Sequence, residues 1–91
     1  MSHPKQAIAD LREVAASGPG RRLIERIMAD CGVWTLSYSS DPLAMAFAEG
    51  RRAAGNQLMA DVMEHAPDAF LAIIQERLNR LREAEHAPDA S

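Results

Sequence analysis

Proline positions divide this 91-residue chain into four segments, and this division constrains the fold more than any other feature. Proline suits the first turn of a helix, where its missing N–H needs no partner, but it disrupts a helix interior. Each segment that begins at a proline carries apolar residues at the spacing of an amphipathic helix. The sequence therefore predicts helices over about 4–16, 19–31, 42–65 and 67–85. We expect an all-α fold, a small bundle with a long central third helix.

The stretch 32–40 is the only predicted non-helical segment that contains aromatic residues. Trp34, Leu36 and Tyr38 alternate with polar residues, which is typical of an extended strand. A single strand has no ladder partner, so we expect an ordered connection whose apolar side lies on the helices. We expect residues 1–91 to form one domain that ends in a frayed tail at 86–91.

Composition and motifs limit the classes of function. A net charge of -3 argues against a protein whose whole surface grips nucleic acid. The single cysteine, Cys31, forms no intramolecular disulfide, and its place on an apolar stripe predicts a buried, inert thiol. No apolar run approaches the roughly 20 residues that span a bilayer. No catalytic motif, phosphate loop or metal-ligand cluster stands out, so we expect no enzyme, no cofactor and no metal site.

Small residues recur on one side of the third predicted helix, together with Leu43, Phe47 and Leu58. Ala46, Gly50 and Ala54 form a shallow groove in which another helix of the chain could approach closely. That contact would offset the roughly 1 kcal/mol that a mid-helix glycine costs relative to alanine. The alternative, a solvent-exposed Gly50 without a packing role, stays open.

A second side of the same helix carries Met45, Arg52 and Met59, with Met63 beside them. One interpretation is a central helix covered on both sides by its own domain. The other is a contact with a second copy of the chain, in which Arg52 reaches the partner's Glu49. A chain this short buries a modest fraction of its surface, so we expect a homo-oligomer.

Arginines cluster at the starts of two glycine-led runs in the second and third predicted helices. If these helices pack together, they would form a candidate basic patch from Arg21, Arg22, Arg26 and Arg51. Such a patch would bind phosphate or an acidic protein surface. The alternative is ordinary solvated arginines that pair with Glu25 and Glu49 at helical spacing.

The order of these features resembles a family of small, functionally uncharacterised proteins of tailed bacteriophages. The stretches that carry the resemblance are GPGRRLIERIMADCGVW and DPLAMAFAEGRR, separated by a loop with a tyrosine, and the similarity covers about residues 17–62. The matching elements are Pro19-Gly20-Arg21, Cys31-Gly32-Val33, and Ala46-Phe47 followed by Glu49-Gly50-Arg51. Members of this family are typically encoded among the head and DNA-packaging genes of short-tailed phages.

The resemblance implies a role in the virion or in its assembly, and it brings no catalytic residues. We therefore expect a non-enzymatic accessory protein of particle assembly, DNA packaging or genome delivery. Its expected partners are further copies of itself and other phage structural proteins, and it has no membrane partner. The alternative is a small DNA-binding protein of the packaging or regulatory machinery, which the net charge disfavours. We expect it in the cytoplasm of the infected bacterial host or in the virion.

Overall fold

The computed structural model describes residues 4–35 and 40–86, and this part of the chain folds into four helices. The helices are α1 (Lys5–Ala15), α2 (Gly18–Asp30), α3 (Pro42–His65) and α4 (Pro67–His86). The all-α prediction is confirmed, and each helix begins and ends within one residue of its predicted boundary. The expectations for Leu36 and Tyr38, and for the tail beyond residue 86, fall outside the described residues.

Local sequence sets the ends of the helices. The Ser17 hydroxyl accepts a hydrogen bond from the Gly20 N–H at 3.0 Å, and the Asp41 carboxylate accepts one from the Leu43 N–H at 3.1 Å. Both are side-chain caps at positions where a proline follows in the first turn. Gly32 follows α2 with φ of +81°, in the left-handed region where glycine is favoured after the end of a helix. Side-chain caps thus set the starts of α2 and α3.

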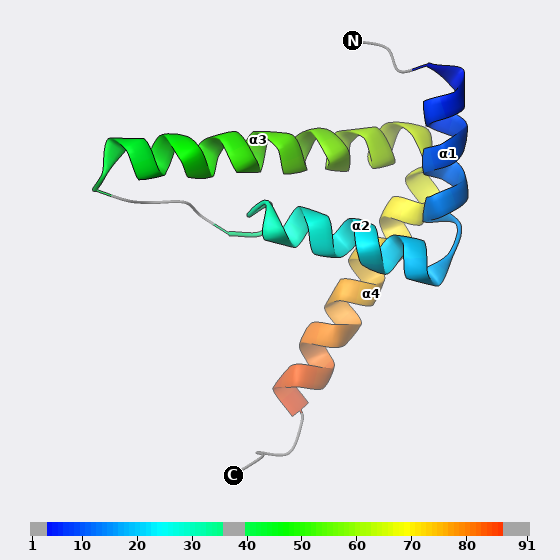
Figure 1. Cartoon of the computed structure of the whole chain (residues 1–91). Helices are drawn as coiled ribbons and strands as arrows, with labels where there is room; N and C mark the ends of the chain where they lie inside the picture. Colours follow the sequence, from blue (N-terminus) through cyan, green and yellow to red (C-terminus); the bar gives the residue numbers. More distant parts are fainter. Residues whose placement is uncertain (1–3, 36–39, 87–91) are drawn as a thin grey trace.

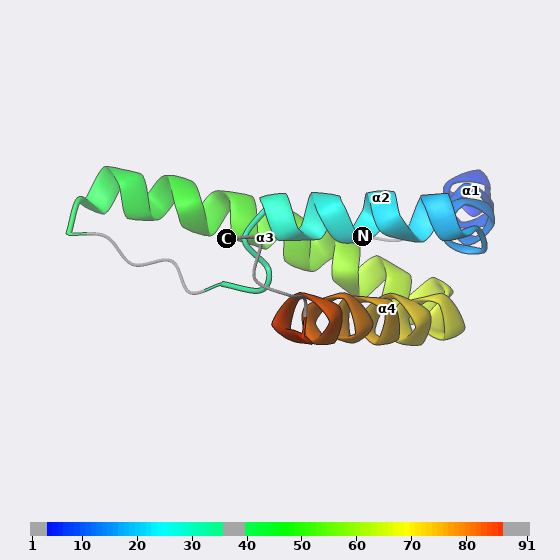
Figure 2. The ribbon, with the colours of Figure 1, turned by 90° about the horizontal axis from the view of Figure 1, so that it is seen from below.

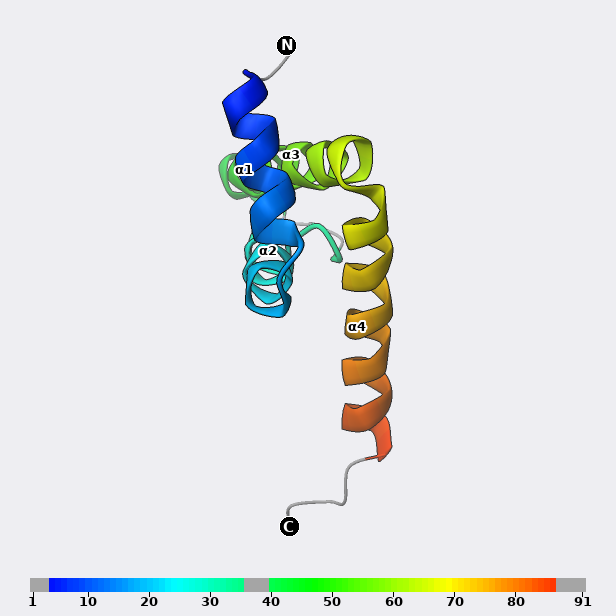
Figure 3. The ribbon, with the colours of Figure 1, turned by 90° about the vertical axis from the view of Figure 1, so that its right-hand side faces the viewer.

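The helices lie in two layers, with α1 and α2 in one and α4 in the other (Figures 2 and 3). α2 runs beside the C-terminal half of α3 in the opposite direction, and α1 crosses the ends of both (Figure 1). A single residue, Ala66, separates α3 from α4, and its N–H donates to the Val62 carbonyl at 2.8 Å. This sharp corner turns α4 back beneath α2, where the two helices make contact.

The hydrophobic core lies where the four helices cross. Its buried hydrophobic residues, at least one from each helix, are Ala15, Ile24, Met28, Val62 and Ile73. Val33 and Trp34 pack against this core, so the predicted apolar contact of the interhelical connection is confirmed for its first residues. These residues form turns rather than an extended strand. The core is small for a chain of this length, and it contains no fully buried aromatic residue among the described positions.

Two helix ends extend beyond the crossing region. The N-terminal half of α3 extends past the end of α2, and the C-terminal half of α4 extends away from the other helices (Figure 1). The radius of gyration is 15.5 Å, against about 12 Å for a compact domain of this length. The molecule measures 48 × 39 × 15 Å, so it is flat and open. Many apolar side chains therefore remain outside the core.

Candidate interaction surfaces

The predicted close-packing face of α3 does not pack within the chain. A Cβ added to Gly50 would meet nothing within 4 Å, and Ala46 and Ala54 are exposed. The prediction that Ala46, Gly50 and Ala54 receive another helix of the same chain is therefore wrong. The physical reason is that α2 ends before it reaches them, so this part of α3 has no neighbour on that side (Figure 1). The alternative reading, an exposed Gly50, is the one the structure supports.

The close approach occurs instead at Gly55, on a different side of α3. A Cβ at Gly55 would lie 2.6 Å from both the Cβ of Cys31 and the Cγ2 of Val33. Gly55 is buried, and it lets the end of α2 and the following turn approach the α3 backbone. Cys31 itself is only partly buried, so the prediction of a buried residue is wrong.

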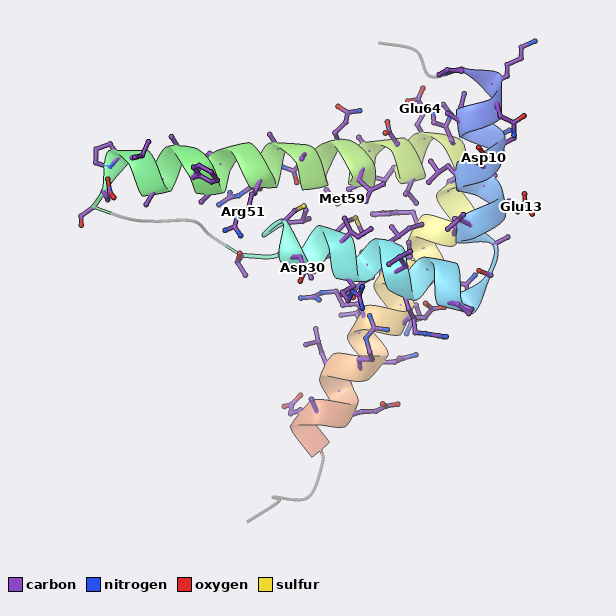
Figure 4. The ribbon with its side chains drawn as sticks, in the orientation of Figure 1. Asp10, Glu13, Asp30, Arg51, Met59 and Glu64 are labelled. Atoms are coloured by element: carbon purple, nitrogen blue, oxygen red, sulfur yellow. The ribbon has the colours of Figure 1, made fainter. Side chains whose placement is uncertain are left out.

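The side of α3 assigned to a second copy largely faces the protein's own core. Met59 packs against the core and extends from the side of α3 that faces α2 (Figure 4), which favours the alternative interpretation of a helix covered by its own domain. Arg52 is mostly covered by its own chain and pairs with its own Glu49 at 3.3 Å, one turn earlier. Met45 is half-buried, whereas Met63 is half exposed. These four residues therefore do not form one free surface.

An outward surface lies on the N-terminal half of α3, residues 42–54, which we call the α3 arm. Leu43 and Phe47 are each 74% exposed there. A shallow hollow of about 460 Å³ lies beside them, lined by Ala46, Phe47, Gly50, Arg51 and Ala54. Small side chains on a helix leave room for a partner's side chains to approach the backbone closely. The side of α3 that was predicted to pack within the chain is thus exposed, while much of the side that was predicted to contact a second copy is covered by its own chain.

The candidate basic patch is not assembled as predicted. Arg21 donates from Nη1 to the carbonyls of Ala15 and Ala16 at 3.2 and 3.1 Å, and its Nε pairs with Glu76 at 2.9 Å. It therefore caps the end of α1 and binds α4, which leaves little capacity for a ligand. Gly20 makes this contact possible, because a Cβ there would overlap with the carbonyl of Val14.

The other patch arginines lie apart. Arg51 extends from α3 on the side where α2 ends at Asp30 (Figure 4), whereas Arg22 is in the first turns of α2. Eight residues of helix, about 12 Å along the axis, separate Arg22 from Asp30. Arg22 and Arg26 are exposed, and no ion pair joins either to another described residue. The four arginines therefore do not form one patch.

A polar contact between α2 and α4, which we call the polar clamp, was not predicted. Glu25 accepts from Arg77 at 2.8 Å and pairs with Arg80 at 3.3 Å, and Arg21 adds its bond to Glu76. The Arg77 guanidinium also lies over the Trp34 ring, 4.6 Å from its centre. The sequence signal for this contact was the helical spacing of complementary charges on α2 and on α4. The sequence also offered ordinary pairing of arginines with Glu25 and Glu49 at helical spacing. That pairing is confirmed for Glu49, which pairs with Arg52, whereas Glu25 pairs with Arg77 and Arg80 of α4.

A hollow of about 410 Å³ at the junction of α1, α3 and α4 is lined by Arg12 and Arg21. Arg12 donates from Nε to the His65 carbonyl at 2.7 Å, so it caps the end of α3 as Arg21 caps α1. The cations that line this hollow are thus engaged by backbone carbonyls. Among the described residues, no group of three His, Cys, Asp or Glu side chains could hold a metal ion. No helix in this part of the chain has the length and apolarity that crossing a membrane requires.

The chain is similar to a known family of proteins. A family model described as Bbp19-like phage protein matches residues 8–75. The match begins in α1 and ends in α4, so it extends beyond residues 17–62, which carry the resemblance read from the sequence. No curated protein and no solved structure matches the chain. Because the family model covers more than half of the 91 residues, the chain belongs to the family of Bbp19-like phage proteins.

Proposed function

We propose that this phage protein is a non-enzymatic accessory factor of particle assembly, DNA packaging or genome delivery, and that it acts through protein–protein contacts. The observation that carries the proposal is the α3 arm, which exposes two large apolar side chains, Leu43 and Phe47, outside the protein's own core. Isolated apolar residues are common on protein surfaces, but a contiguous apolar surface beside a hollow is typical of an interaction site. The head and packaging gene context implied by the resemblance supports the same role.

The α3 arm suits a helical or extended segment of another phage structural protein. Gly50 and Ala54 let such a segment approach the α3 backbone, while Phe47 supplies a rigid apolar anchor. Arg51 lies at the edge of the hollow, where it can pair with an acidic group of the partner. This function places the protein in the cytoplasm of the infected host and, where the contact persists, in the virion.

A small DNA-binding protein is the second candidate. It is favoured by Arg22 and Arg26, which lie one turn apart on the outer face of α2 and are both exposed. Two arginines offer few phosphate contacts, and the net charge of -3 opposes binding to DNA. We expect no retention of duplex DNA at physiological salt. Binding that weakens steeply with salt, and is lost in Arg22→Ala with Arg26→Ala, would favour this candidate over the first.

The direct test uses the phage that encodes the protein. Mass spectrometry of purified particles should detect the chain, or deletion of its gene should reduce the yield of DNA-filled particles. Phe47→Asp should reproduce the deletion, because a charge at the anchor opposes apolar contact. The matched control is Ala53→Asp, which is exposed in the same arm but does not line the hollow. Particles of normal composition, DNA content and infectivity without the gene would overturn the proposal.

A further inference from the structure

α4 carries a second apolar face that the described part of its own chain leaves largely uncovered. Leu71, Ile74, Leu78 and Leu81 follow one another at intervals of three, four and three residues. Leu71 is 65% exposed, Leu78 41% and Leu81 52%, while Ile74 is half-buried. This spacing over two heptads is the seam of a coiled coil. We call these four residues the α4 seam.

α4 cannot rotate to bury the seam in the core, because the opposite edge of the helix is already fixed against the core and α2. Ile73 is fully buried, and Glu76, Arg77 and Arg80 hold α4 against α2 through the polar clamp. Rotating α4 to bury the seam would break these ion pairs and expose Ile73. The apolar surface must therefore be covered from outside the fold or remain in water.

We propose that the α4 seam pairs with the α4 seam of a second copy, in antiparallel orientation. A two-fold axis beside the middle of the seam sets Leu71 against the partner's Leu81, and Ile74 against the partner's Leu78. Each apolar residue of one copy then meets an apolar residue of the other. The contact is isologous, so it closes at a dimer.

Charges beside the seam select the antiparallel orientation. One edge carries Asp68, Gln75 and Arg82 at seven-residue intervals, and antiparallel pairing brings this edge against itself. Asp68 then faces the partner's Arg82 on both sides of the axis, which gives two complementary pairs. Asp68 and Arg82 are both exposed. Arg77 lies on the other edge, but Glu25 and the Trp34 ring hold its guanidinium.

Parallel pairing offers no such match. It would bring opposite edges together and set Arg77 against the partner's Arg82, so that like charges meet. The seam would also continue to Glu85, which would face its own copy in the partner. The residues that flank the seam thus favour one orientation and oppose the other.

The exposed area is consistent with such a dimer. The accessible surface is 6696 Å², roughly 1,500 Å² more than the ~5,200 Å² expected for a compact monomer of this size. A standard interface removes about 800 Å² from each partner. A seam of two heptads buries less than that, so we expect dissociation in the micromolar range. The inference does not depend on the proposed function.

The test is sedimentation equilibrium of the full chain from 5 to 500 μM. We expect a monomer–dimer equilibrium that Leu78→Glu weakens roughly 100-fold, because each dimer loses two seam leucines. Arg82→Asp should weaken it about 10-fold, since it sets Asp68 against a like charge twice. The double variant Asp68→Arg with Arg82→Asp should restore most of the affinity. Leu43→Glu, on the α3 arm, is the matched control and should leave the dimer unchanged.

Three outcomes would overturn the proposal. The first is a monomer at 500 μM. The second is tighter association of Arg82→Asp, which indicates parallel pairing. The third is a dimer that Leu43→Glu dissociates and Leu78→Glu does not, which moves the interface to the α3 arm. Circular dichroism at 5 μM checks that each variant is folded, and Leu71→Glu replaces Leu78→Glu if the latter unfolds, because Leu71 is the more exposed of the two.

Discussion

The two halves of α3 share a similar pattern of small and apolar residues but differ in their surroundings. The C-terminal half contributes Gly55 and Val62 to the interior, whereas the α3 arm contributes no fully buried residue. In the C-terminal half, Gly55 accommodates the turn after α2, whereas in the N-terminal half Gly50 faces open space. An apolar pattern thus marks where a helix can be covered, and it does not identify the element that covers it.

Helix length explains the difference. α3 has 24 residues and α2 has 13, which correspond to about 36 and 20 Å. α2 therefore covers little more than half of α3, and the remainder extends beyond it (Figure 1). The part of α4 that follows Arg80 likewise lies beyond the end of the polar clamp. Three matched pairs of substitutions and one single substitution test this contrast between the crossing region and the extended ends.

The largest effect is expected in the core. Met28 is fully buried, so Met28→Ala should lower the free energy of unfolding by about 2–5 kcal/mol through lost contacts and a cavity. The matched change Leu43→Ala in the α3 arm should alter it by less than about 0.5 kcal/mol, because that side chain is already in water. Urea unfolding at 5 μM measures both. Similar losses in the two variants would show that the arm is covered after all.

The two glycines of α3 give the next largest contrast. Gly55→Leu should cost about 2–3 kcal/mol, since even its Cβ meets Cys31 and Val33 at 2.6 Å. Gly50→Leu should not destabilise the fold and should gain a few tenths of a kcal/mol from helix propensity. This reverses the expectation drawn from sequence, which assigned the close contact to Gly50. Thermal unfolding of the two variants decides between the assignments, and a strong loss in Gly50→Leu would reinstate the original one.

The polar clamp should contribute a smaller amount. Glu25 has a side chain only 14% exposed, and Glu25→Ala removes the acid that both Arg77 and Arg80 contact. We expect a loss of about 1–2 kcal/mol in the free energy of unfolding. Glu83→Ala, at an exposed position of α4 without an ion pair to another described residue, is the control and should change little. Equal stability of the two variants would mean that the clamp only orients α4.

The smallest effect is expected at Arg52. Its ion pair with Glu49 is partly exposed, and its buried Nε has no hydrogen-bond acceptor among the described residues. Arg52→Met keeps most of the apolar contact of the side chain and removes that unsatisfied group. We therefore expect a change of less than about 0.5 kcal/mol by thermal unfolding. A loss above 1 kcal/mol would indicate that the Arg52 charge is needed in the folded monomer.

The sequence by itself determined the helices and their ends. Pro19, Pro42 and Pro67 stand at the starts of three helices, while Ser17 and Asp41 cap two of them. These features are local, because a cap or a missing N–H acts within one helical turn. The apolar spacing is also a property of each helix by itself, and it correctly predicted an all-α fold. The sequence also showed the resemblance to a phage protein family, over about residues 17–62. The family model matches the longer stretch 8–75, which extends past this range on both sides.

Only the tertiary structure decided which face of each helix is buried. α3 has apolar or small residues on two sides, so its sequence fits either side against the core. The contact of Gly55 with Cys31 and Val33 made the choice, and it depends on where α2 ends relative to α3. Likewise, α4 has one broad apolar face in sequence, which the polar clamp divides into a buried edge with Ile73 and an exposed seam. Such choices depend on contacts between residues far apart in the chain, and the periodicity of a single helix carries no information about them.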